Sequence, residues 1–167
     1  MEREACDGCG FIWDEPTSEE ILDRLGRAAD GHLAVLTATG PDLGARPAPE
    51  VWSPLEYAGH VRDVLLNLRD RIIVGLAEDD PRPKSMYGTL RIERGMYRHD
   101  TPAQLALELS AATRLLVATV SVLTTDELER PVFYPWPRPA TRTLHWVAAQ
   151  ALHESEHHLA DIEALIS

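Results

Sequence analysis

Apolar residues recur along most of this chain with the period of an α-helix. Val61 is followed by Leu65, Leu68 and Ile72 at intervals of three or four residues, so these side chains lie on one face of a helix. Comparable stripes run through residues 105–120 and 144–162, and apolar–polar alternation typical of a strand is not sustained anywhere. The pattern predicts an all-α protein, a four-helix bundle, with long helices near residues 18–39, 54–78, 102–123 and 143–166.

Helix-start signals precede these stripes. The clearest is Ser53–Pro54–Leu55–Glu56, in which Ser53 caps the first turn, Pro54 fits the first helical position and Glu56 reaches back to the cap. Similar signals stand at Thr17 with Glu20, at Thr101 with Gln104, at Thr124 with Glu127, where a short helical stretch begins, and at Thr141 or Thr143.

Two connections are too long for simple turns between helices. Residues 79–101 carry mixed charge and two tyrosines, and residues 131–142 hold four prolines and three aromatic residues. The second segment is expected to be a stiff, packed loop. Long structured loops on a compact domain usually carry function or cover a site.

The length of 167 residues and the hydrophobic content of 44% indicate one soluble domain. We divide it into an N-terminal arm, residues 1–16, and a bundle domain, residues 17–167. The net charge of −11 argues against nucleic-acid partners and anionic lipid. Neither a secretory core at the N-terminus nor about 18 unbroken apolar residues is present, so we expect a cytoplasmic protein without a membrane partner.

The arm contains the chain's two cysteines, Cys6 and Cys9, in the sequence CDGCG. This spacing resembles half of a zinc knuckle, but a structural zinc ion needs four ligands and there is no second cysteine pair. Three interpretations stay open: an arm that is mobile or locally packed, a zinc site completed by a histidine or a second subunit, or a redox pair.

Three of the seven histidines fall within six residues of the last predicted helix. His153 and His157 are four residues apart and therefore share a face, which suits two imidazoles on one metal ion. His158 is rotated by about 100° from His157, and we expect it to point elsewhere. The third candidate ligand is His60, which flanks the apolar stripe of the second helix. Three ligands and an open position are typical of a catalytic metal site.

Other polar residues have weaker signals. Glu56 lies four residues before His60, and Asp161 lies four residues after His157, so either could hydrogen-bond a ligand's distal nitrogen. Both also have ordinary interpretations, as a helix cap and as a solvated helix residue. The remaining histidines with no partner at suggestive spacing are expected to be surface or packing residues: His32, His99 and His145.

The segments WSPLEYAGHVRD and HESEHHLADI together resemble the DinB-like (YfiT-like) family of metal-binding four-helix proteins, over about residues 17–166. That family places one ligand histidine on the second helix and an HxxxH pair on the last. The resemblance implies that His60, His153 and His157 bind a divalent metal, either Zn, Ni, Mn or Fe. It also implies an up-down-down-up bundle with one long crossover, and a homodimer.

Activities in that family centre on low-molecular-weight thiols, so the resemblance implies a thiol S-transferase in which the metal binds the thiol as a thiolate. The cosubstrate would be mycothiol or bacillithiol. The composition, with 16 basic residues of which one is lysine, is typical of GC-rich genomes and favours mycothiol by association. The implied partners are a small thiol and an electrophile. Alternatives are a non-catalytic, stress-related metal-binding dimer and a mycothiol-dependent isomerase or biosynthetic enzyme.

The segment before the last helix offers residues that could bind a substrate. Arg138 and Arg142 could pair with carboxylates, and Tyr134 and Trp136 could form an apolar wall. Prolines and aromatic residues also simply close the ends of bundles, and exposed arginines are usually solvated. Sequence alone does not identify the electrophile, the metal or the role of the cysteine pair.

Overall fold

The structure, a computed structural model, describes residues 4–40, 42–136 and 138–167. Residues 1–3 of the predicted arm and Pro137 of the predicted 131–142 loop therefore lie outside the described residues, as does Pro41. Four long helices form the bundle: α1 (Ser18–Thr37), α2 (Pro54–Ala77), α4 (Pro102–Val120) and α6 (Leu144–Ile166). The prediction of a four-helix bundle is confirmed.

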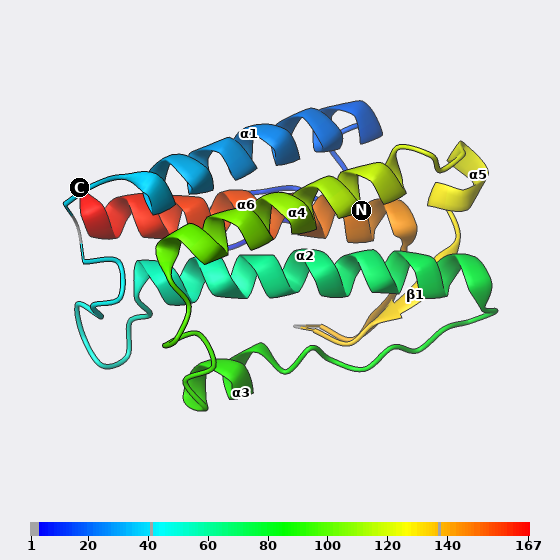
Figure 1. Cartoon of the computed structure of the whole chain (residues 1–167). Helices are drawn as coiled ribbons and strands as arrows, with labels where there is room; N and C mark the ends of the chain where they lie inside the picture. The colour runs from blue at the N-terminus through cyan, green and yellow to red at the C-terminus, as the bar shows by residue number, and fades with distance from the viewer. Residues whose placement is uncertain (1–3, 41, 137) are drawn as a thin grey trace.

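The helices form a ring in which α1 and α2 each pack against both α4 and α6. Figure 1 shows that α1 and α6 run in one direction, whereas α2 and α4 run in the other. This is the up-down-down-up order. It requires a long crossover between α2 and α4, which carries the short helix α3 (Gly88–Glu93).

The predicted helix starts are observed. Thr17 with Glu20, Ser53 with Glu56 and Thr124 with Glu127 form complete capping boxes, the last opening the short helix α5 (Thr125–Leu128). Thr101 caps α4, and Thr143 rather than Thr141 caps α6. The helix ends are less well predicted, since α1, α2 and α4 each stop one to three residues before the expected boundary.

The interior of the ring is filled by the predicted apolar stripes. Leu65 and Ile72 of α2, Leu109 and Leu116 of α4, and Leu152 of α6 are at most 1% exposed. Burying a leucine or isoleucine stabilises the fold by about 1.5–3 kcal/mol. By length and composition α4 could also cross a membrane, but its buried leucines already pack in the bundle.

The expectation of a loop at residues 131–142 is wrong. Strands β1 (Pro131–Tyr134) and β2 (Ala140–Thr143) form an antiparallel hairpin in which Pro131 pairs with Thr143. Val132 and Tyr134 point inwards while Pro131 is exposed, so the alternation of a strand is present but lasts only four residues. Such a short pattern is masked by the neighbouring prolines.

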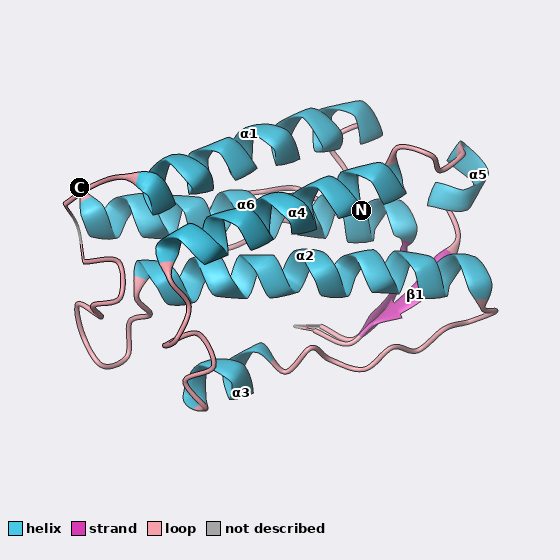
Figure 2. Cartoon of the chain, viewed as in Figure 1, coloured by secondary structure: helices cyan, strands magenta, loops and turns pink. Residues whose placement is uncertain are grey.

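The hairpin and the α2–α4 crossover lie on the same side of α2 (Figure 2). The N-terminal arm packs against α6. Trp13 is buried, stacks on Trp146 with ring centroids 5.7 Å apart, and donates a hydrogen bond from Nε1 to Oε1 of Gln150 at 2.6 Å. The described part of the arm is therefore locally packed, one of the alternatives left open by the sequence.

Candidate metal centre

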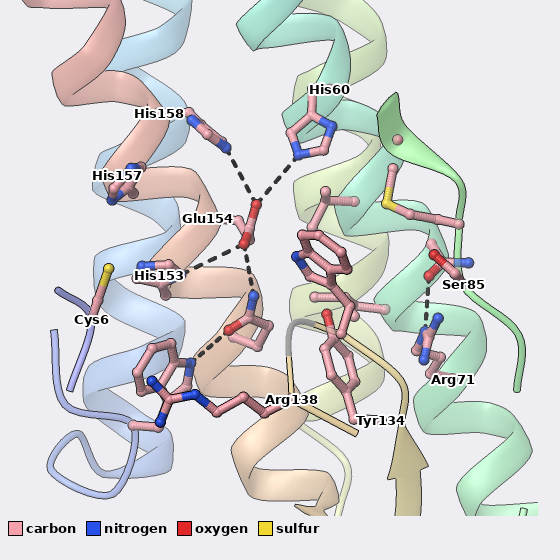
Figure 3. A pocket seen from close by; sticks show the side chains of 18 of the residues that line it. Cys6, His60, Arg71, Ser85, Tyr134, Arg138, His153, Glu154, His157 and His158 are labelled. Atoms are coloured by element: carbon pink, nitrogen blue, oxygen red, sulfur yellow. Dashed lines mark hydrogen bonds and ion pairs between the residues drawn. The ribbon is translucent and has the colours of Figure 1, made fainter. Parts of the chain in front are cut away.

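Helix α6 presents two pairs of potential metal ligands on adjacent faces. Glu154 and His158 are one turn apart, and so are His153 and His157. Because neighbouring residues of an α-helix are rotated by about 100°, the two pairs point to different surroundings. Figure 3 shows Glu154 and His158 directed towards His60 of α2, and His153 next to Cys6 of the arm.

The first group consists of His60, Glu154 and His158, whose ligand atoms all lie within 4.8 Å of one another. The Nε2 atoms of His60 and His158 are each 3.4 Å from Oε2 of Glu154. Two atoms bonded at about 2.1 Å to one ion at tetrahedral angles stand about 3.4 Å apart. The spacing therefore fits a divalent metal with two imidazoles and one carboxylate.

The second group consists of Cys6, Cys9, His153 and His157, again with all ligand atoms within 4.8 Å. A third set, His157, His158 and Asp161, overlaps both. Among the described residues no such group joins His60 to His153 and His157.

The structure thus divides the predicted ligand triad between two groups. His153 and His157 do share a face, as expected, but that face meets the arm and not α2. Glu154 and His158 were not among the predicted partners of His60. Their spacing of four residues is the same signal as that of the histidine pair, but it joins a carboxylate to an imidazole.

Electrostatics favour the charged forms of Glu154 and His158 in the first group. Burial alone would raise the pKa of Glu154, but its contacts with His153, His158 and His60 keep that pKa well below its usual range. Burial alone would lower the pKa of His158, yet Asp161 and Glu154 raise it to about 9. Glu154 is therefore a partly buried carboxylate whose charge is balanced by imidazolium.

In the second group, the thiol of Cys6 ionises more readily than a free cysteine. Burial raises the pKa of Cys6, but hydrogen bonds from the backbone amides of Cys9 and Gly8, together with His153, bring it to about 7. The pKa of Cys9 is raised, chiefly by burial. Cys6 is thus the first of the two thiols to become a thiolate.

The two candidate supporting carboxylates have different partners. Asp161 accepts a hydrogen bond from Nδ1 of His158 at 2.8 Å, which leaves Nε2 of His158 free to face Glu154. It supports His158 rather than His157, whose Nε2 is 3.6 Å away. Glu56 instead caps α2 and forms a bidentate ion pair with Arg46, with both N–O distances at 2.6 Å.

A cavity of about 670 Å³ lies beside the first group. It is bounded by α2, α6, the arm, the hairpin and the crossover, so both long connections contribute to it. The four predicted substrate-binding residues all line it: Tyr134, Trp136, Arg138 and Arg142. Arg142 is already engaged, since it pairs with Glu4 at 2.7 Å and lies over the ring of Trp146.

Arg71 of α2 also lines the cavity, although no pattern in the sequence indicated it. Its side chain is buried, its guanidinium lies over the ring of Tyr134, and no carboxylate in the described chain pairs with it. Nε donates to Asn67 and Nη2 to the carbonyl of Lys84, whereas buried Nη1 has no hydrogen-bond partner. Burial lowers the pKa of Arg71, and an anion in the cavity would satisfy its free donor.

Three solved structures with the same fold have different described functions or none. YfiT from Bacillus subtilis, a probable metal-dependent hydrolase with an unusual four-helix bundle topology, is 18% identical with a TM-score of 0.77, over 91% of this chain and 89% of its own. The mycothiol-dependent maleylpyruvate isomerase is 15% identical with a TM-score of 0.71, over 90% of this chain. This chain spans 62% of that isomerase. TT2238, a four-helix bundle protein, is 23% identical with a TM-score of 0.60, over 89% and 99% of the two chains.

At these identities the likeness concerns the fold. Among curated proteins none is significantly similar in sequence to this chain. Residues 21–162, which include α2, most of α6 and the first ligand group, match the DinB superfamily. Since that match extends over most of the chain, the protein belongs to the DinB superfamily.

Proposed function

We propose that this protein is a divalent-metal-dependent enzyme, and that it transfers a low-molecular-weight thiol to an electrophile. The observation that carries the proposal is the group of His60, Glu154 and His158 at the wall of a large cavity. Three protein ligands leave room for a further ligand, as in catalytic rather than structural sites. Two nitrogens and one carboxylate oxygen suit Zn, Ni, Mn or Fe.

The chain's own residues prepare this site. Asp161 accepts the Nδ1 proton of His158 and so fixes the tautomer whose Nε2 faces Glu154. The amide of Gln150 donates to Oε1 of Glu154 at 2.7 Å, which leaves Oε2 directed at the two imidazoles. A divalent ion held there would act as a Lewis acid that lowers the pKa of a bound thiol.

The cavity suits an electrophile with a negative group. Arg71 is buried, has no carboxylate partner in the described chain and has an unsatisfied Nη1. Arg138 also lines the cavity, and Tyr134, Trp136 and Trp146 supply aromatic surface. A carboxylate placed against Arg71 would orient an apolar body along these rings.

The transfer step needs no oxidant. The thiol's sulfur forms a bond to the electrophilic carbon, the leaving group departs with its bonding electrons, and the thiol proton goes to solvent. With a chlorodinitrobenzoate the leaving group is chloride. The thiol supplies the nucleophile, which agrees with the placement of Cys6 and Cys9 in the other ligand group.

Hydrolysis is the second candidate, supported by the likeness to YfiT along 91% of this chain. In that case water would take the place of the thiol as nucleophile. The two functions differ in whether product formation depends on a thiol.

The test uses protein stripped by a chelator and reloaded with one metal at a time. Mycothiol and a carboxylated chlorodinitrobenzene are supplied, and both thiol loss and chloride release are measured. We expect both to require metal, and to proceed faster than with the neutral chlorodinitrobenzene. Product formed equally well without any thiol would establish hydrolysis and overturn the transferase proposal.

A matched pair of variants tests the anion site. Arg71→Lys keeps the charge and Arg71→Gln removes it, so KM for the carboxylated electrophile should rise about tenfold more in Arg71→Gln. KM for the neutral compound should be similar in both variants. An equal effect on both electrophiles would assign Arg71 to packing alone.

A further inference from the structure

The N-terminal arm brings its two cysteines together at the tip of a small hairpin. Ala5 and Ile12 form an antiparallel bridge, and the amide of Cys6 donates to the carbonyl of Phe11 at 2.8 Å. The amide of Gly10 donates back to the carbonyl of Cys6 at 2.8 Å, and Gly10 has φ of 75°, a left-handed conformation that glycine adopts without strain. The CDGCG turn therefore directs both sulfur atoms to one side.

That side faces two imidazoles of α6. The sulfurs of Cys6 and Cys9 and one nitrogen each of His153 and His157 all lie within 4.8 Å of one another. The turn approaches closely because Gly8 has no side chain, as a Cβ there would stand 3.1 Å from Cε1 of His157. Figure 3 shows Cys6 beside His153, on the opposite side of Glu154 from His60.

Each of the two imidazoles has one carboxylate 3.6 Å away, Glu154 for His153 and Asp161 for His157, but both rings have buried nitrogens without a hydrogen bond. His153 is 8% exposed, and neither of its ring nitrogens makes a hydrogen bond. The nearest carboxylate oxygen, Oε1 of Glu154, is 3.6 Å from Nδ1 of His153 and beyond hydrogen-bonding distance. Nδ1 of His157 is also buried without a partner. A buried ring with both nitrogens unsatisfied is costly, and a metal ion would satisfy it.

We propose that Cys6, Cys9, His153 and His157 bind a structural zinc ion that fastens the N-terminal arm to α6. Two thiolates and two imidazoles form the tetrahedral set that zinc prefers, with bonds of about 2.0–2.3 Å and ligand atoms about 3.3–3.8 Å apart. The observed grouping needs only a small contraction to reach that geometry. Four protein ligands fill the coordination sphere, and both thiol protons leave to solvent on binding.

The zinc ion has a structural consequence for the cavity. Cys6, Asp7 and Gly8 form part of the cavity wall, and Trp13 of the same arm hydrogen-bonds Gln150, which in turn hydrogen-bonds Glu154. Fastening the turn to α6 therefore fixes one wall of the cavity and supports the carboxylate of the other ligand group. The inference does not depend on the proposed reaction, because it concerns a separate set of ligands.

The test measures metal content and the type of ligands. Wild-type protein, the double variant Cys6→Ser/Cys9→Ser, and Glu154→Gln are purified and loaded with Zn²⁺ or Co²⁺ alone. We expect about two ions per chain in the wild type and about one in each variant. In the Co²⁺ forms, the near-ultraviolet sulfur-to-cobalt band should be present in the wild type and Glu154→Gln, and lost in the cysteine variant.

The metal contents and spectra of the three proteins distinguish a failure of the zinc site from a failure of the proposed function. If only the first group fails to bind metal, Glu154→Gln has the metal content of the wild type while the cysteine variant still loses one ion. If the zinc inference is wrong, the wild type has no sulfur-to-cobalt band, or a disulfide lowers its mass by about 2 Da. Should the cysteine variant not fold, X-ray absorption of Zn-loaded Glu154→Gln decides the point. Two sulfur and two nitrogen neighbours support the inference, and oxygen and nitrogen neighbours alone overturn it.

Discussion

The two faces of α6 place similar residues in different chemical surroundings. Glu154 and His158 face α2, where His60 adds one more nitrogen and a large cavity begins. His153 and His157 face the arm, where two thiols complete a set of four ligands. Both groups border this cavity, but the first has three protein ligands, whereas the second has four and includes the turn of the arm.

This difference shows that the ligands supplied by neighbouring segments decide the use of a pair of ligands one turn apart on a helix. On the first face His60 adds a second nitrogen to the nitrogen and oxygen of α6, a set that suits an ion that also binds a substrate. On the second face the partners are sulfur, which suit an ion held permanently. Since 100° of helix rotation separates the faces, one helical turn can serve two metal sites.

The largest expected effect comes from removing a ligand on the first face. Glu154→Gln should lower thiol-transfer activity about a thousandfold, because loss of a ligand exceeds the 10–100-fold effects of outer-shell changes. In the same assay His153→Ala should lower activity only about tenfold, through a loosened arm. The measurement is kcat/KM for both variants after loading with the same metal.

The ratio of kcat/KM between these two variants directly tests the comparison of the two faces of α6. If His153→Ala were the more damaging change, the originally predicted triad of His60, His153 and His157 would describe the working site better. Metal analysis of the same samples identifies which ion was lost.

Much of the fold followed from local chemistry in the sequence. Thr17, Ser53 and Thr124 marked helix starts because the capping box uses only residues within one turn. The hairpin at residues 131–143 was not predicted because each of its strands is only four residues long. At the site, His60 does face α6, but the structure groups it with Glu154 and His158 and not with the predicted His153 and His157. The choice between residues 153/157 and 154/158 depends on the rotation of α6 about its axis, which the apolar stripe defines only approximately.

His32 provides a reference that lies on neither face. His32 of α1 is fully buried, and its Nε2 donates to the carbonyl of Ser155 at 3.0 Å. Burial lowers its pKa to about 4, despite the opposing effect of that hydrogen bond. The unfolded chain therefore takes up a proton on this residue first as the pH falls below about 6.5. Stability is complete above that pH and is lost on acidification towards pH 4.

The second prediction follows from this linkage. Between pH 6.5 and pH 5, wild-type protein should lose about 2 kcal/mol of unfolding free energy through His32 alone. His32→Gln keeps a donor to the Ser155 carbonyl but does not titrate. Its unfolding free energy should therefore fall by about 2 kcal/mol less than that of the wild type over this pH range. Urea unfolding of both metal-stripped proteins across this range gives the difference. Parallel pH curves for the two proteins would contradict the assignment of His32 as a neutral packing residue.

The third prediction concerns Asp161, which lies near both faces but contacts them unequally. It hydrogen-bonds Nδ1 of His158 at 2.8 Å and stands 3.6 Å from Nε2 of His157. Asp161→Asn should weaken metal binding at the first group about tenfold, because the ring of His158 loses its charged acceptor. The sulfur-to-cobalt band of the second group should titrate as in the wild type. Competition with a chelator for Co²⁺ measures both affinities in one experiment, and equal weakening would mean that the two groups are not independent.

The smallest expected effect tests the link between the arm and Glu154. Trp13 donates to Gln150 at 2.6 Å, whereas the indole N–H of Trp146 is buried without a partner. The two rings stack on each other, so replacing either with Phe removes a similar part of the same contact. Trp13→Phe should therefore cost about 1 kcal/mol more unfolding free energy than Trp146→Phe, the worth of one hydrogen bond whose acceptor is left buried. Equal losses in denaturant unfolding would show that the Trp13–Gln150 contact does not stabilise the arm. The zinc ligands would then be its main attachment to α6.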